Sequence, residues 1–177
     1  MTDPAAGSAA SSPLIVICVG FYLNPDTRSA IVGVRTWDDP TIRMEQSLVT
    51  TPANDLGRER LFLRELAPIT RLIDAVVPRP VCILVDGYCT LDQGRPGFGR
   101  ELYDHYAGAI PVLGVAKKPY RGAPAEEVVR HGRKPLYVTA VGMTLAEAAA
   151  NVQAMHGTHR VPEALRSCDQ LARAGWC

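Results

Sequence analysis

Hydrophobic positions along the chain predict three strands before any helix. Residues 14–23 are apolar and β-branched, which is typical of a buried strand. The Asn-Pro-Asp sequence at 24–26 indicates a turn, residues 29–37 a second strand, and the alternating residues 42–49 a third. Because the turns between them are short, we expect an antiparallel meander.

The hydrophobic period then changes to that of a helix. Apolar residues at helical spacing predict a helix from about residue 58 to residue 76: Phe62, Leu66, Ile69, Ile73 and Val76. The short apolar run 81–85 follows and suits a central parallel strand. We expect another helix at 97–107 and strands at 111–116 and 136–141.

Two helices complete the predicted order. Thr144 and Glu147 have the spacing of a capping box before an Ala-rich helix, and Pro162 suits the first turn of a final helix. An antiparallel three-strand meander followed by parallel βα units, with helices on both faces of a mixed sheet, is the layout of the ribonuclease H-like α/β fold. We expect one domain over residues 14–177 and a flexible tail over residues 1–13.

Composition narrows the class of protein. The 177 residues suffice for one domain with a sizeable core, and 47% of them are hydrophobic. A net charge of +1 gives no whole-molecule attraction to nucleic acid. No apolar stretch approaches the roughly 20 residues needed to span a bilayer, so we expect no membrane partner. Residues 1–13 lack the pattern of a signal peptide, and the five cysteines form no CxxC pair, which favours reduced thiols in the cytoplasm.

Three charged residues occupy positions suited to chemistry. Asp86 directly follows a buried strand, where α/β folds place their sites, although Asp-Gly also caps turns. Glu65 borders the apolar stripe of its helix, where a carboxylate either reaches solvent or needs a partner or a metal. Lys117 ends the strand 111–116, as a surface residue or as a phosphate ligand. Together they describe a metal-dependent phosphodiesterase.

Positive charge gathers in the segment 117–134. It has six Lys and Arg residues against two Glu residues, a local excess of four. This pattern fits a polyanion site and a solvated loop equally well. None of the four histidines has a position that predicts a role; His159, next to Arg160, is a candidate substrate contact.

Four segments resemble endonuclease V in order and spacing. They are Phe62-Leu63-Arg64-Glu65, Val85-Asp86-Gly87-Tyr88, the run 113–118 (Leu-Gly-Val-Ala-Lys-Lys) and the run 160–166 (Arg-Val-Pro-Glu-Ala-Leu-Arg). The likeness extends from about residue 14 to residue 172. Each motif alone is weakly specific, whereas the four in order are fairly specific.

The resemblance implies an activity and roles for particular residues. Endonuclease V enzymes need Mg²⁺ and nick DNA or RNA on the 3′ side of deaminated purines, chiefly inosine. By resemblance, Glu65 and Asp86 would hold a weakly bound Mg²⁺ or Mn²⁺, and Lys117 would contact phosphate near the scissile bond. Further contacts to single-stranded or lesion-containing nucleic acid would come from Lys118, Arg121 and Arg160.

The chain departs from the family where chemistry is expected. Cys18 stands where the family's first strand carries a metal-binding Asp, and a thiol is a poor ligand for Mg²⁺. Met143 stands where the family carries a His. Residues 55–58 replace a Pro-Tyr-rich wedge, and residues 89–94 replace a Gly-rich turn that carries a His.

The missing ligand leaves several hypotheses open. Asp92 is a candidate substitute and Asp26 a weaker one, while Cys18 and Cys89 with Asp86 suit a softer metal such as Zn²⁺. The chain is accordingly an active endonuclease, a catalytically impaired nucleic-acid-binding homologue, or a homologue with an interaction role. Its oligomeric state is not predicted.

Overall fold

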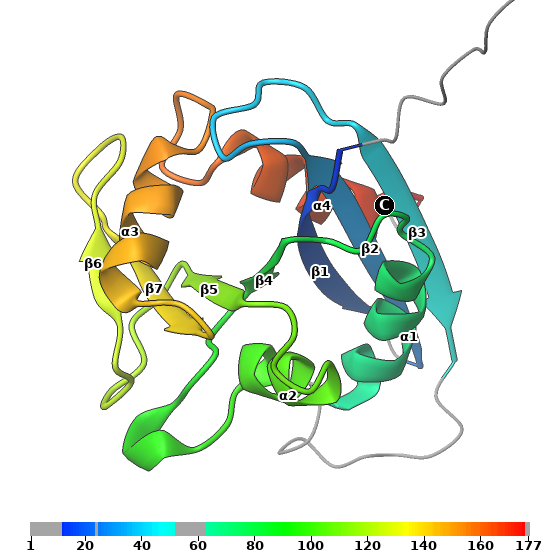
Figure 1. Cartoon of the computed structure of the whole chain (residues 1–177), viewed down its shortest axis with the longest axis horizontal. Helices are drawn as coiled ribbons and strands as arrows, with labels where there is room; N and C mark the ends of the chain where they lie inside the picture. The colour runs from blue at the N-terminus through cyan, green and yellow to red at the C-terminus, as the bar shows by residue number, and fades with distance from the viewer. Residues whose placement is uncertain (1–11, 24, 52–62, 176–177) are drawn as a thin grey trace, which may run out of the picture.

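A seven-stranded mixed sheet forms the centre of the molecule (Figure 1). The computed structural model describes residues 12–23, 25–51 and 63–175. The strand order is β3-β2-β1-β4-β5-β7-β6. Among the described residues, no helix is long and apolar enough to cross a membrane.

The predicted meander is present at one side of the sheet. It comprises β1 (Ile15–Leu23), β2 (Asp26–Val34) and β3 (Met44–Thr50), each antiparallel to the next. The second strand begins three residues earlier than predicted, because the ladder continues to the pair Leu23 and Asp26 beside the turn. It also ends earlier, because the Asp39 carboxylate accepts hydrogen bonds from the amides of Arg35 and Thr41 and turns the chain there.

The other side of the sheet is only partly parallel. β4 (Cys82–Asp86) lies parallel to β1, and β5 (Val112–Ala116) lies parallel to β4, as predicted. β7 (Leu136–Val141) is instead antiparallel to β5, and β6 (Glu126–Val128) is antiparallel to β7. The predicted parallel units are thus those of β4 and β5, and the sequence did not predict the direction of β7. β6 was not predicted, because two of its three residues are exposed Glu residues and the segment shows no alternation of apolar and polar positions.

Helices cover both faces of the sheet, as predicted (Figure 1). On one face lie α1 (Leu63–Asp74) and α2 (Phe98–His105), and on the other α3 (Leu145–Ala154) and α4 (Glu163–Arg173). The capping box is confirmed, because Thr144 Oγ1 accepts a hydrogen bond of 3.2 Å from the Glu147 amide. A short 3₁₀ turn, η2 (Asp92–Gly94), lies in the long connection after β4.

The register of the parallel strands determines where the site lies. Cys18 in β1 pairs with Val85 in β4, and Asp86 pairs with Val115 in β5. The carboxyl ends of these three strands therefore meet at one edge of the sheet. This edge is where ligands bind in open α/β sheets.

Candidate active site

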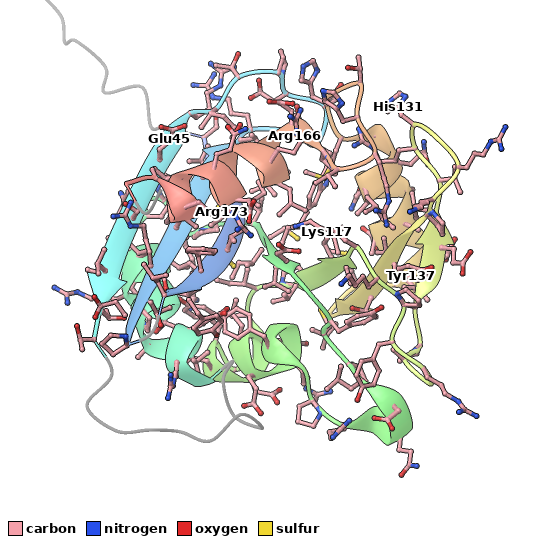
Figure 2. The ribbon with its side chains drawn as sticks, turned by 180° about the vertical axis from the view of Figure 1, so that it is seen from behind. Glu45, Lys117, His131, Tyr137, Arg166 and Arg173 are labelled. Atoms are coloured by element: carbon pink, nitrogen blue, oxygen red, sulfur yellow. The ribbon has the colours of Figure 1, made fainter. Side chains whose placement is uncertain are left out.

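Asp86 and Lys117 meet at the carboxyl edge of the sheet. Asp86 follows four fully or nearly buried residues of β4, and Lys117 directly follows β5. Lys117 Nζ donates a hydrogen bond of 2.8 Å to Asp86 Oδ2, with the Lys side chain 37% exposed and the Asp side chain 21% exposed. Figure 2 shows Lys117 near the middle of this side of the molecule. The pair is thus open to a ligand while held by the sheet.

Glu65 reaches the same edge from α1, through a gap in β1. A Cβ atom at Gly20 would lie 2.4 Å from Glu65 Cδ and 2.6 Å from Oε1. The absence of a side chain at Gly20 therefore makes room for the carboxylate. Sequence reasoning missed Gly20, although a glycine inside a strand often marks a place where another group approaches the backbone closely.

The environment of Glu65 disfavours its charged form. Burial raises the pKa of Glu65 to about 7; a hydrogen bond with Tyr22 opposes this rise, and the charge of Asp86 adds to it. The pKa of Tyr22 is itself raised by burial and by Glu65, so this phenol stays neutral and donates to the carboxylate. The negative charges of Glu65 and Asp86 therefore repel one another across the site. A bound cation would relieve both the burial and the repulsion.

Cys18 lies beside the two carboxylates but is a core residue. Its side chain is 1% exposed, and its Sγ donates a hydrogen bond of 3.5 Å to the Leu84 carbonyl. Burial raises the pKa of Cys18 well above its ordinary value, and the nearby Cys168, Glu65 and Asp86 raise it further. A thiol is a poor ligand for the hard Mg²⁺ ion, which prefers oxygen. The position aligned with the family's Asp therefore supplies no carboxylate to the site.

The hypothesis that Cys18, Cys89 and Asp86 hold Zn²⁺ is not supported, because Cys89 is a buried core residue. Burial raises the pKa of Cys89 to about 12, and its Sγ donates a hydrogen bond of 3.5 Å to the Val112 carbonyl. Within residues 12–23, 25–51 and 63–175, no three His, Cys, Asp or Glu side chains gather to hold a metal. Cys18, Cys89 and Asp86 are therefore not a zinc site.

The substitute carboxylates are also engaged elsewhere. Asp92 Oδ1 accepts a hydrogen bond of 2.8 Å from Arg95, and Asp26 Oδ1 accepts one from Thr51 Oγ1 at 2.5 Å. Neither joins Glu65 and Asp86 in a ligand group of the described residues, so the structure does not support Asp92 as a third ligand. Met143 is partly buried against the hydrophobic core. Residues 55–58, the altered wedge, lie outside the described residues.

Two carboxylates still fit one kind of metal site. A small hard cation such as Mg²⁺ is commonly held by one or two carboxylates, with waters and substrate phosphates as the remaining ligands. Glu65 and Asp86 supply that number and type of donor. They do not fit a cage completed by protein ligands alone.

The predicted basic contacts separate into two groups. Lys118, next to Lys117 in sequence, and Arg121 are exposed, and Arg121 lines a hollow with Asp92 and Tyr120 rather than with Asp86. Arg160 instead donates hydrogen bonds to the carbonyls of Lys117 at 2.6 Å and Pro135 at 2.7 Å. Its guanidinium thus holds the backbone that carries Lys117. The sequence motif identified this residue without indicating that role.

Comparisons with known proteins identify the fold and the relatives of the chain. No protein-family model matches it. A crystal structure of endonuclease V from Streptomyces avermitilis superposes with a TM-score of 0.76 at 21% identity, over 93% of this chain and 82% of that one. The catalytic domain of human endonuclease V gives a TM-score of 0.78 at 19% identity, with the same coverage. The fold is therefore that of the endonuclease V proteins, and the ribonuclease H-like prediction is confirmed.

The sequence comparison leads to the same group. The chain is 31% identical to endonuclease V of Streptomyces coelicolor over 137 residues, which are 64% of this chain and 58% of that protein. It thus aligns with less than two thirds of the length of this relative. The predicted resemblance is confirmed: by sequence and by fold, the chain is a relative of endonuclease V.

Proposed function

We propose that the chain is a metal-dependent endonuclease that hydrolyses a phosphodiester bond near deaminated purines, such as inosine, in DNA or RNA. The observation that carries this proposal is the Asp86–Lys117 pair, 2.8 Å apart and beside Glu65 at the carboxyl edge of the sheet. An acceptor pair for a cation and an ammonium group for a phosphate are the two parts that phosphodiester hydrolysis requires.

The carboxylates would hold the metal. Glu65 and Asp86 are the proposed ligands of Mg²⁺ or Mn²⁺, with binding weakened by the lack of a third protein carboxylate. When bound, such an ion polarises a phosphoryl oxygen and lowers the pKa of a bound water. Tyr22 orients Glu65 by its hydrogen bond, and Gly20 leaves the space that this carboxylate occupies.

Lys117 would contact the phosphate. Its ammonium group lies against Asp86 and is 37% exposed, so a phosphate oxygen can approach it from solvent. Arg160 fixes the main chain at Lys117 through the carbonyl of that residue. A fixed cation beside the carboxylates favours the extra negative charge that develops on the phosphate during hydrolysis.

The proposed substrate follows from the relatives. An endonuclease V from Ciona intestinalis, with a TM-score of 0.72 at 17% identity over 94% of this chain and 87% of that one, was crystallised in complex with DNA containing an inosine. The exposed Lys118, which follows Lys117, and the exposed Arg121 support a nucleic-acid partner here. All four cysteines of the described residues are free thiols, which suits a protein of the cytoplasm.

A second function has specific support in two side chains. Cys18 is sealed in the core, and Met143 packs against the core where the family carries a His. These two replacements favour a homologue that binds nucleic acid without cleaving it. The two functions differ in turnover, whereas both require binding.

Cleavage of labelled single-stranded DNA and RNA that contain one inosine tests the proposal. The wild-type chain is assayed with Mg²⁺, with Mn²⁺ and with chelator, beside Asp86→Asn. Cleavage that needs both the metal and Asp86 is the expected result. A folded wild-type chain that binds these strands but cleaves neither of them with either metal would establish the binding-only function instead.

A further inference from the structure

A pocket opens beside Lys117 on the α4 side of the sheet. Its volume is about 390 Å³, within the range of small-ligand sites. Its wall includes Lys117, His159, Arg160, Val161, Arg166 and Asp169. Figure 2 shows Lys117 near the centre of this face, with Arg166 on the neighbouring helix. The pocket thus adjoins the carboxyl edge of the sheet through Lys117, but Glu65 and Asp86 do not line it.

The wall is held rigid by two arginine residues. Arg130 donates hydrogen bonds to the carbonyls of Met155, Gly157, His159 and Arg160. Arg160 donates to the carbonyls of Pro135 and Lys117 on the other side. The segment that carries His159 is therefore fixed before any ligand arrives, which lowers the entropic cost of binding.

The pocket lining has more basic than acidic side chains. His159 is exposed, and Arg166 is 35% exposed while its Nη1 lies 3.0 Å from Glu163 Oε2. The one acid of the wall, Asp169, is paired with Arg173 at 2.9 Å. Val161, which is half-buried, adds apolar surface. Basic side chains beside an apolar one are complementary to a phosphate joined to a sugar.

We infer that this pocket binds one sugar–phosphate unit of the substrate strand. That unit is the neighbour of the phosphodiester that is hydrolysed beside Asp86. His159 and Arg166 contact its phosphate, and the half-buried Val161 packs against its sugar. The inference rests on the proposed function, because it assigns a strand of nucleic acid to the edge that Asp86 and Lys117 form. It gives the strand a direction across the molecule, from the carboxylates toward α4.

A pair of matched double variants tests the pocket. Binding of a fluorescent single-stranded oligonucleotide containing inosine is measured in chelator, for the wild-type chain, for His159→Ala with Arg166→Gln, and for His105→Ala with Arg100→Gln. The second variant removes the same residue types from exposed positions of α2, on the opposite face of the sheet, where Arg100 pairs with Asp104 as Arg166 pairs with Glu163. The pocket variant should bind about tenfold more weakly, with a salt slope reduced by about 0.7 for each lost phosphate contact.

Equal losses in the two double variants would overturn the inference. Among the residues that the structure describes, the exposed His159 side chain makes no hydrogen bond or ion pair, so His159→Ala alone is a second variant should loss of the Glu163 pair unfold the chain. Its affinity should fall by a few fold. An unchanged affinity of folded His159→Ala would also overturn the inference.

Neutral linkages identify the phosphate. Methylphosphonate is placed at each position of the oligonucleotide in turn. One position flanking the cleaved bond should weaken binding by the wild-type chain without weakening binding by His159→Ala any further. Identical profiles for the two proteins would count against a dedicated phosphate contact at this residue.

Cleavage separates this inference from the proposed function. A wild-type chain with the linkage-specific pattern but no turnover would overturn the nuclease and support the pocket. A wild-type chain that cleaves, with equal KM values in the two double variants, would support the nuclease and overturn the pocket. A wild-type chain that does not bind the strand in chelator or with Mg²⁺ would overturn both.

Discussion

The neighbouring strands β1 and β4 run parallel, yet they end with different chemistry. β4 carries the partly exposed carboxylate of Asp86 at its last residue. β1 carries the buried thiol of Cys18 opposite Val85, and then Gly20, over which Glu65 of α1 lies. At β4 the strand itself supplies a carboxylate, that of Asp86. Beside β1 the carboxylate comes from Glu65 of the helix α1. A change at β4 should remove the chemistry, and changes at β1 should tune it.

The largest expected effect is at the end of β4. Asp86→Asn keeps the shape of the side chain and removes the charge that pairs with Lys117. Cleavage should fall by about 10³-fold or more, because several kcal/mol of metal-dependent stabilisation are lost. The measurement is the single-turnover rate on an inosine-containing strand.

The matched change in β1 is Cys18→Ala. It should lower the free energy of unfolding by about 1 kcal/mol and leave the cleavage rate of the folded chain unchanged. If Cys18→Ala lowered the rate as much as Asp86→Asn does, the contrast between the two strands would be wrong.

The next effect tests the space at Gly20. Gly20→Ala places a Cβ 2.4 Å from Glu65 Cδ, so the carboxylate must move. The clash involves a flexible side chain, and the fold should survive. Affinity for Mn²⁺, measured by calorimetry, should fall by about 10- to 100-fold, as when the support of a metal ligand is removed.

Gly33→Ala is the control for Gly20→Ala. It lies in β2, and its Cβ would lie 2.7 Å from Leu14 Cδ1 and 3.2 Å from Met44 Cε, far from Glu65. Both changes add one methyl group inside a strand and alter strand propensity alike. Only the change at Gly20 should weaken metal binding. Equal weakening by both changes would show that β1 has no special relation to Glu65.

Sequence reasoning located the part of the site that depends on strand ends. The apolar run 81–85 predicted that Asp86 would emerge at the carboxyl edge, and the motif at Lys117 lies at the end of the neighbouring strand. Both positions follow from local patterns, since a buried strand must end where polar residues resume. The same logic correctly predicted the cap at Thr144.

Contacts between distant segments could not be predicted in this way. Gly20 and Glu65 are separated by more than forty residues, and only the packing of α1 on the sheet brings them together. The basic segment 117–134 predicted a polyanion site from charge alone. Within it Arg130 is instead used by four main-chain carbonyls, which no count of charges can reveal.

Restoring an acid in β1 should have an intermediate effect. Cys18→Asp places a third carboxylate in a buried position beside Glu65 and Asp86, so the chain should be destabilised by several kcal/mol in chelator. Mg²⁺ should return much of this stability and raise cleavage above the wild-type rate. Thermal unfolding with and without Mg²⁺ measures both parts.

Cys18→Asn separates charge from shape in this experiment. It has nearly the same volume as Cys18→Asp, and should gain no extra stability from Mg²⁺ over the wild-type chain. A Cys18→Asp variant that folds and responds to Mg²⁺ no better than Cys18→Asn would show that position 18 does not face the metal site.

The last effect depends on pH and concerns protonation of Glu65. Its pKa in the folded chain is about 7, against an ordinary 4.5, mainly because of burial. Between these values the folded chain binds more protons than the unfolded chain does, so the free energy of unfolding falls as the pH rises from about 4.5 to 7. Glu65→Gln removes this loss. In chelator the variant should be more stable than the wild-type chain by about 2 kcal/mol at pH 8, and nearly equal to it at pH 4.5.

Denaturant unfolding at these two pH values, with and without Mg²⁺, completes the comparison between the strands. At pH 8 Mg²⁺ should stabilise the wild-type chain and reverse its disadvantage, because the ion binds the ionised carboxylate that β1 accommodates at Gly20. Glu65→Gln should show little response to the ion. Parallel pH profiles of stability for the wild-type chain and Glu65→Gln would mean that the Glu65 carboxylate is not buried above β1. In that case α1 would not supply the carboxylate that β1 lacks.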